Sequence, residues 1–248
     1  MTLSQNWIDT VEDGLSNRDW DAYDALIRSE IGECVCSARE AGYNPRFIEN
    51  TASGYVCVDW TLVKAMLWVE SGGPRQASWT TRPMQIGNPG DAAYGVLKNG
   101  AEGSALVMSP TLFNAIRTQS IDSPELNTRA AIAYLFTRMA KFDVQTVPDE
   151  SDKTVHSVTV VHGDSLERIA RRVGTSIDEL KNFRSEVSIT QLRIGEKLRY
   201  RKMKTGRVIV GWRKWDFVTI AARYNGGGDP AYADKLAFVA NLFPRLKR

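Results

Sequence analysis

Glu70 is the residue of this sequence best placed to do acid–base chemistry, because it ends an apolar segment that two glycines and a proline then close. The carbonyl end of a helix and apolar neighbours both disfavour negative charge, so both raise the pKa of a glutamate. A carboxyl group that stays protonated near neutral pH can serve as a general acid. We therefore expect Glu70 to donate a proton, although a simple exposed helix end would look much the same from this segment alone.

Three short motifs follow one another along the chain: Glu70-Ser71, Met84-Gln85-Ile86, and Tyr224-Asn225-Gly226. Together they resemble the signature motifs of the soluble lytic transglycosylase and goose-type lysozyme superfamily, over residues 60–141 and 212–243. The order of the motifs carries the resemblance, since each is weak alone. The sequence departs from the usual pattern at Arg82, Pro83 and Arg223, which concerns the shape of the cleft wall more than the acid.

The resemblance implies a role for each of these residues. Glu70 would protonate the glycosidic oxygen between N-acetylmuramic acid and N-acetylglucosamine. Met84, Gln85 and Ile86 would line the sugar cleft, although Met84 is equally well explained as a core residue. Ser71 would hold the turn or orient the substrate. Tyr224 would contact the acid or the departing sugar, and Asn225 would hydrogen-bond the glycan. Gly226 completes the set of substrate-binding residues.

The motifs fix no second catalytic carboxylate. Hydrolysis with inversion needs one to activate water and retention needs a nucleophile, whereas lytic transglycosylases use the 6-hydroxyl of the sugar and form a 1,6-anhydro ring. Asp91, six residues after Gln85, is the nearest candidate base, and a role as the cap of a turn or helix is the favoured alternative. The sequence supports glycan cleavage without choosing between the products.

Residues 158–199 resemble a LysM domain. The resemblance rests on Gly163-Asp164-Ser165-Leu166, Ile169-Ala170, Gly174-Thr175 and the segment 194–198. The resemblance implies a shallow groove for N-acetylglucosamine-containing glycans, formed by Gly163, Asp164 and Ser165 with Ile189, Thr190 and Gln191. The usual Asn-Pro after the second helix is replaced by Asn182-Phe183, which affects binding strength. A LysM fold that serves only as a spacer is the alternative.

Hydrophobic periodicity, together with the glycines, prolines and capping residues that bound each segment, predicts the elements that must position these residues. An apolar stripe predicts a helix that opens near Asp59 or Thr61 and ends at Glu70, and further helices are predicted at 112–117, 127–141, 217–223 and 231–242. A polar linker is expected from residue 144, followed by a strand. Two capping boxes, Asp164-x-x-Glu167 and Ser176-x-x-Glu179, open two short helices. Strands at 189–200 and 207–212 complete the pattern.

These elements predict an α+β protein in which a mainly α, lysozyme-like domain is interrupted by a small βααβ LysM module. The catalytic domain spans residues 1–143 and 207–248. The linker strands and the LysM module span 144–206, with the module's core at 157–200.

Composition excludes some classes of protein and leaves the role of the cysteines open. The 248 residues are 43% hydrophobic and 25% charged, as in a folded domain, and no apolar run reaches the roughly 18–20 residues of a membrane span. The basic segment 193–214 lacks aromatic platforms or a nucleic-acid motif, so we expect no nucleic-acid partner. Cys34, Cys36 and Cys57 suggest buried thiols or a bond from Cys57 to one of the other two. We expect no metal and no cofactor.

The preferred function is a peptidoglycan-cleaving enzyme with its own wall-binding module. A catalytically degenerate LysM protein, a phage endolysin and a chitin-cleaving enzyme are the alternatives. The N-terminal segment lacks the basic and apolar regions of a signal peptide, so synthesis in the cytoplasm and action in the periplasm of a target cell are expected. The resemblance suggests a type VI secretion effector, with a periplasmic immunity protein and a secretion-tip protein as partners, and the acidic residues 1–60 as a docking surface.

Overall fold

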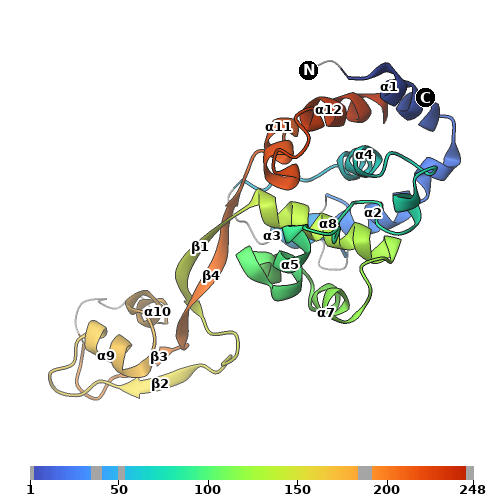
Figure 1. The fold of residues 1–248 in the computed structure, drawn as a ribbon. Coiled ribbons are helices and arrows are strands. Elements are labelled where there is room, and N and C mark those ends of the chain that lie inside the picture. The colour runs from blue at the N-terminus through green and yellow to red at the C-terminus, as the bar shows by residue number, and fades with distance from the viewer. Residues whose placement is uncertain (1–2, 35–40, 50–53, 184–191, 244–248) are drawn as a thin grey trace. The chain divides into compact units, whose positions relative to one another are not determined.

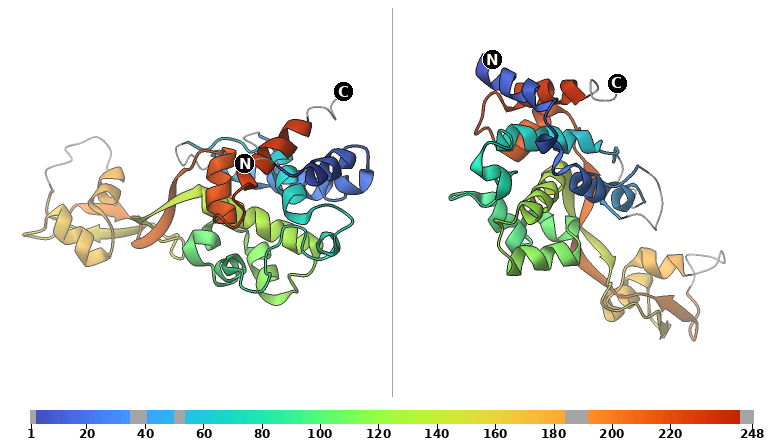
Figure 2. Two further views of the ribbon diagram at one scale, coloured as in Figure 1. Left: turned by 45° about the horizontal axis from the view of Figure 1, so that its top comes forward. Right: turned by 90° about the vertical axis from the view of Figure 1, so that its right-hand side faces the viewer.

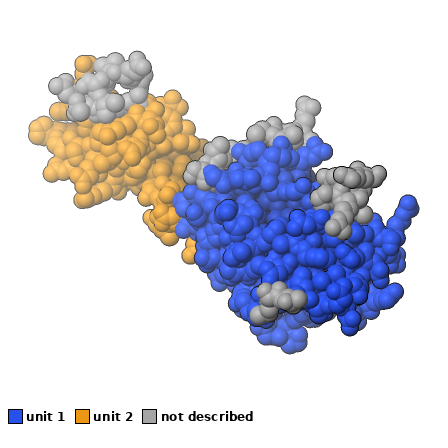
Figure 3. Space-filling view, turned by 90° about the horizontal axis from the view of Figure 1, so that it is seen from above, with its two compact units in different colours: residues 1–142, 209–248 blue, residues 143–208 orange. Residues whose placement is uncertain are grey.

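The computed structural model describes residues 3–34, 41–49, 54–183 and 192–243. The chain forms two compact units, shown in different colours in Figure 3. Unit 1 comprises Met1–Phe142 and Ile209–Arg248, and unit 2 is the intervening segment Asp143–Val208. Helices dominate the described residues, and the strands form two sheets of two strands each. This architecture agrees with the predicted α+β class.

Unit 1 is built almost entirely from helices (Figure 1). They are α1 (Gln5–Gly14), α2 (Asp24–Ile31), α3 (Tyr43–Glu49), α4 (Trp60–Ser71), α5 (Ala92–Asn99), α6 (Ser104–Val107), α7 (Pro110–Thr118), α8 (Pro124–Met139), α11 (Phe217–Ile220) and α12 (Tyr232–Leu242). A π-helix, Ala221–Asn225, continues α11, and 3-10 turns occupy Arg18–Asp21, Ala77–Thr80 and Ala101–Gly103.

Helix α4 is the central element of unit 1, and it lies against α2 and α12 in every view (Figures 1 and 2). Asp59 caps it by accepting a hydrogen bond from the backbone N–H of Thr61, which decides between the two predicted starting points. Trp68 is fully buried, with its ring centroid 4.5 Å from that of Trp20. Burying a side chain of this size stabilises the fold by roughly 1.5–3 kcal/mol, so packing fixes the position of α4.

The buried Lys64 ties α4 to the preceding segment. Its ammonium group pairs with Asp24 at 2.8 Å and also with Asp21, which compensates a charge that would otherwise be costly to bury. A disulfide joins Cys34 to Cys57 and connects the end of α2 to the residues just before α4. This selects one of the predicted pairings, and Cys36 lies outside the described residues.

Strand β1 (Ala140–Pro148) pairs with β4 (Met203–Trp212), so the polar linker expected from residue 144 was wrong over its first residues. Most side chains of β1 are exposed, and the segment therefore lacks the apolar alternation that would identify a strand. Its backbone pairing with β4 holds it instead.

Unit 2 has the predicted order of strand, helix, helix and strand: β2 (His156–Thr159), α9 (Leu166–Val173), α10 (Ile177–Asn182) and β3 (Lys197–Tyr200). The two strands are antiparallel, with His156 opposite Tyr200. Their small core consists of Val160, Ile169, Ala170, Leu180, Leu198 and Tyr200. Strand β3 begins later than the predicted residue 189, and residues 189–191 lie outside the described part of the chain.

The two predicted capping boxes of unit 2 had different outcomes. Ser176 caps α10 through the N–H of Glu179, as predicted. Ser165, and not Asp164, caps α9 through the N–H of Arg168. Asp164 is engaged elsewhere, since it accepts the N–H of Val161 and pairs with Arg172. The capping prediction at Asp164 was therefore off by one residue.

Among the residues that the structure describes, no helix is long and apolar enough to cross a membrane.

Candidate active site

Glu70 lies in the last turn of α4, with its side chain partly accessible. Tyr232, at the start of α12, donates a hydrogen bond from its hydroxyl to Glu70 Oε1 at 2.8 Å. Burial raises the pKa of Glu70 to about 7, and the negative charges of Asp229 and Asp91 act in the same direction. The bond from Tyr232 and the charge of Lys235 oppose this rise. A substantial fraction of Glu70 is therefore protonated at neutral pH, as a general acid requires.

The turn after Glu70 has a defined geometry that Ser71 maintains. The buried Ser71 hydroxyl donates to the carbonyl of Leu67 at 2.7 Å and accepts the N–H of Gly73 at 3.1 Å. Gly72 then ends α4 with a left-handed conformation, φ 68°. Of the two roles expected for Ser71, these hydrogen bonds correspond to the one in which it holds the turn.

The second motif lies in the loop before α5. Met84 and Ile86 are only 1% and 4% exposed, so their side chains belong to the core and support the loop from below. Gln85 is partly exposed and has φ 60°, while its side-chain oxygen accepts a hydrogen bond from Asn88 at 2.6 Å. The buried Asn127 on α8 accepts the N–H of Met84 and donates to the carbonyl of Ile86, and it thereby fixes the loop.

The third motif lies in the π-helix after α11. The hydroxyl of Tyr224 donates to the carbonyl of Met84 at 3.3 Å, and its pKa is raised by burial and by the charge of Glu70. Asn225 accepts the N–H of Asp229, and Gly226 ends the helix with φ 64°. Tyr224 thus brings the third motif into contact with the second, 140 residues away in sequence, and close to Glu70 of the first.

Two carboxylates lie close enough to Glu70 for their charges to raise its pKa. Asp91 caps α5: one oxygen accepts the N–H of Ala93 at 2.8 Å and the other that of Gly87 at 2.7 Å. Asp229 accepts the N–H of Ala231 and pairs with Lys235 at 2.7 Å, and its pKa is lowered chiefly by the Lys235 hydrogen bond. Both groups are engaged in structural bonds, which for Asp91 is the capping role that the sequence favoured.

Sequence reasoning missed Tyr232, Asp229 and Asn127. No motif marks them, and Asn127 and Tyr232 lie 43 and 162 residues from Met84 and Glu70, the residues they contact. The spacing Asp229-x-x-Tyr232 at the start of α12 is a signal that could have been weighed, because the preceding motif already placed this segment near the acid.

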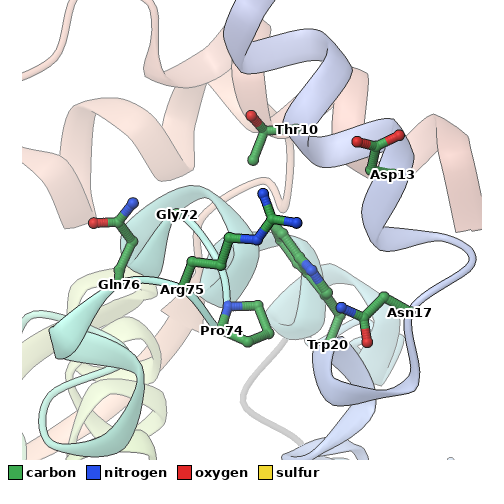
Figure 4. A pocket seen from close by; sticks show the side chains of 8 residues that line it. All are labelled: Thr10, Asp13, Asn17, Trp20, Gly72, Pro74, Arg75 and Gln76. Carbon is green, nitrogen blue, oxygen red and sulfur yellow. The ribbon is translucent and has the colours of Figure 1, made fainter.

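A separate pocket of about 260 Å³ adjoins the loop that follows α4 (Figure 4). Thr10 and Asp13 contribute to it from α1, and Pro74, Arg75 and Gln76 from the loop, with Asn17, Trp20 and Gly72 completing the lining. Glu70, Tyr224 and Tyr232 are not among its lining residues, so the pocket is distinct from the surroundings of the acid.

The residues predicted to form a glycan groove in unit 2 are only partly described. Gly163 has φ 80° and its carbonyl accepts a bond from Arg168, and Ser165 caps α9. The side chain of Asp164 is 5% exposed and is held by Arg172 at 2.7 Å. The Asp164 carboxylate is thus held within the loop, whereas Ser165 is exposed. Ile189, Thr190 and Gln191 fall outside the described residues, so their part of the groove stays a prediction.

Comparison with known families identifies a LysM domain at residues 158–199. This segment contains the last two residues of β2, all of α9 and α10, and most of β3. The match indicates a module that binds peptidoglycan or related glycans. No curated protein and no solved structure matches the chain.

Proposed function

We propose that the protein cleaves the glycan strands of peptidoglycan, as a muramidase or lytic transglycosylase, and that Glu70 is its general acid. The observation that carries this proposal is the raised pKa of Glu70, a carboxyl group partly buried beside Tyr232 and Tyr224. The resemblance of the three motifs to the lytic transglycosylase and goose-type lysozyme superfamily supports the proposal, as does the LysM match.

In the proposed reaction, protonated Glu70 donates its proton to the glycosidic oxygen between N-acetylmuramic acid and N-acetylglucosamine while the C–O bond breaks. The carboxylate that remains keeps its hydrogen bond from Tyr232, which stabilises the charged form. The partly exposed Gln85 and Asn225 would contact the sugars. Met84 and Ile86 would hold the loop rather than touch the glycan.

The state of the two nearby carboxylates bears on the product. Asp91 and Asp229 each use both oxygens in bonds to backbone N–H groups or to Lys235. These bonds give both carboxylates a structural role, and we propose that the sugar's own 6-hydroxyl attacks instead, with its proton passing to the carboxylate of Glu70. We therefore expect 1,6-anhydro ends, and mass spectrometry of the released fragments distinguishes them from reducing ends.

The central experiment compares the wild type with Glu70→Gln on purified peptidoglycan. Removal of a general acid lowers the rate by about 10²–10⁴-fold, and the glutamine preserves the shape of the side chain. Glu12→Gln, an exposed position on α1, is the matched control and should retain full activity. Equal clearing by the wild type and Glu70→Gln would exclude Glu70 as the acid, and clearing by neither would favour a degenerate LysM binding protein.

We propose that the protein acts in the periplasm or wall of a target bacterium, and that it reaches this compartment as a secreted antibacterial effector. The Cys34–Cys57 disulfide supports this assignment, because such bonds persist in oxidising compartments. A type VI apparatus with a tip protein, and a periplasmic immunity protein, would be the partners. Expression directed to the periplasm should kill a bacterial host, while cytoplasmic expression and periplasmic Glu70→Gln should not.

Two related functions differ from the proposal in their substrate or their release. A chitin-cleaving enzyme would act on chitin oligomers and leave sacculi intact. A phage endolysin would share the chemistry, and its gene would lie beside a holin gene rather than an immunity gene.

A further inference from the structure

Three arginines of unit 1 gather beside the π-helix that carries Tyr224. Arg138 belongs to the last turn of α8, Arg213 directly follows β4, and Arg223 lies in the π-helix itself. Arg138 Nε donates to the backbone carbonyl of Arg223 at 3.0 Å. The N–H of Arg213 donates to the carbonyl of Met139, next to Arg138, at 2.8 Å. These two bonds hold the three residues, which we call the arginine cluster, in one place.

The positive charge of the arginine cluster is poorly compensated. Arg138 pairs with Glu102. Within the described part of the chain, no carboxylate pairs with Arg213 or Arg223, and Arg213 Nε is buried without a hydrogen-bond partner. Burial lowers the pKa of Arg213, and the charges of Arg223 and Arg138 lower it further. A group of opposite charge that binds between like charges relieves their repulsion.

The arginine cluster is connected to the proposed active site by a series of aromatic contacts. The guanidinium carbon of Arg138 lies 5.8 Å from the ring centroid of Tyr134, whose centroid is 5.7 Å from that of Tyr224. The negative charge of Glu70 in turn raises the pKa of Tyr224. Arg223 is exposed and directly precedes Tyr224 in the chain. These contacts place the arginine cluster and Glu70 in the same part of unit 1.

We propose that Arg138, Arg213 and Arg223 form a subsite for a carboxylate of the peptidoglycan stem peptide, an inference that rests on the proposed function. Guanidinium groups bind carboxylates through paired, charge-assisted hydrogen bonds. In peptidoglycan, acidic stem peptides branch from N-acetylmuramic acid, next to the bond that Glu70 would cleave. Chitin carries no carboxylate, and bare glycan strands carry only the lactyl carboxylate of N-acetylmuramic acid. The arginine cluster would therefore select strands that bear peptides.

The test measures turnover of two soluble substrates: glycan strands with stem peptides, and the same strands with the peptide carboxylates converted to amides. The wild type should have a kcat/KM about tenfold higher on the strands with free carboxylates, since a hydrogen bond to a charged group is lost on amidation. Arg223→Gln should lower kcat/KM on the strands with free carboxylates to the value on the amidated strands. Arg213→Gln, which removes the unpartnered guanidinium, should act in the same way.

Two controls separate a binding role from a structural role or a general charge effect. Arg117→Gln removes the same charge at an exposed position on α7 and should keep the preference. The melting temperature of Arg223→Gln should not fall, because the substitution relieves repulsion and breaks no described side-chain bond. A lowered melting temperature with equal losses on both substrates would assign Arg223 a structural role and overturn the proposal.

A binding measurement makes the inference separable from the catalytic proposal. In a Glu70→Gln background, a disaccharide with its stem peptide should bind about tenfold more tightly than the same compound with its peptide carboxylates amidated, and the addition of Arg223→Gln should abolish the difference. If this holds while the wild type cleaves nothing, the arginine subsite stands and the catalytic function fails. If amidation leaves the affinity unchanged, or if Arg223→Gln leaves the effect of amidation intact, the subsite is excluded whatever the wild type cleaves.

Discussion

The proton affinity of Glu70 is set by opposing influences from a few neighbours. Burial and two nearby carboxylates favour the neutral form, and the hydrogen bond from Tyr232 favours the charged form. A general acid needs both influences, because it must hold its proton before the reaction and release it during the reaction. The acid and Tyr232 belong to helices far apart in sequence, so this balance depends on the packing of α12 against α4.

Tyr232→Phe should raise the pKa of Glu70, because it removes the hydrogen bond that lowers that pKa. An enzyme that needs protonated Glu70 loses activity as pH rises through the pKa, which is about 7 in the wild type. The alkaline limb of the pH–rate profile should therefore move to higher pH in Tyr232→Phe. The maximum rate should fall at the same time, since the carboxylate left after proton transfer is less well stabilised.

Tyr94→Phe is the matched control for this shift. Tyr94 is a partly buried tyrosine whose hydroxyl bonds to the carbonyl of Ile116, and it is not among the groups that influence Glu70. Its alkaline limb should coincide with that of the wild type. A Tyr232→Phe profile that moved to lower pH, or that did not move, would contradict the assignment of Glu70 as the titrating acid.

At the scale of elements, the turn that ends α4, directly after Glu70, is closely packed against Trp20. Gly73 has φ 94°, and a Cβ there would lie 2.2 Å from the Trp20 ring, which is itself packed against Trp68. Gly73→Ala should therefore lower the free energy of unfolding by about 2–4 kcal/mol, from backbone strain and overpacking together. Chemical denaturation followed by tryptophan fluorescence measures this loss.

Gly90→Ala isolates the contribution of the contact with Trp20. Gly90 also has a positive φ, 85°, but a Cβ there would meet no atom within 4 Å. The control should lose only the strain component, about 1 kcal/mol. Equal losses in the two variants would mean that the approach to Trp20 contributes nothing.

The disulfide before α4 should contribute about 3 kcal/mol to stability, because it closes a loop with a sequence separation of 23 residues in the unfolded chain. Cys34→Ser and Cys57→Ser should each melt at a lower temperature than the wild type and should no longer respond to a reductant. Cys36→Ser should behave as the wild type does in both conditions. Loss of the reductant response in Cys36→Ser instead would assign the bond to a different pair.

The sequence predicted those elements whose information is local. Helix α4 and its end, the serine cap of α10 and the order of elements in unit 2 follow from caps, glycines and apolar spacing. Strand β1 could not be predicted, because its exposed side chains carry no pattern and its stability comes from β4, about 60 residues later. Asp164 looked like a cap because its preference for turns does not reveal which N–H it accepts.

The candidate site was predictable only where short motifs mark it. Glu70, Gln85 and Tyr224 were found in this way. The burial of Met84 and Ile86 and the contributions of Tyr232 and Asp229 depend on tertiary contacts that no local pattern contains.

At the scale of the whole molecule, each unit has its own hydrophobic core. Ile169 is completely buried in the small core of unit 2, so Ile169→Asp places an unpaired carboxylate there and should unfold unit 2. The variant should fail to sediment with insoluble sacculi and should still cleave soluble glycan strands, because the core of unit 1 does not include this residue.

Val144→Asp is the control, since it introduces the same charge at a 60% exposed position of unit 2 and should keep sacculus binding. Loss of soluble turnover in Ile169→Asp would show that unit 1 depends on an intact unit 2.

The hydrogen bond between the carbonyl of Met139 and the N–H of Arg213 has a consequence for protein engineering. It joins the two points at which the chain leaves and re-enters the helical core, so the gap that any replacement must span is only one hydrogen bond wide. A different carbohydrate-recognition module whose termini lie close together could be grafted there in place of the LysM segment. Unit 1 could thereby be combined with modules that recognise other carbohydrates.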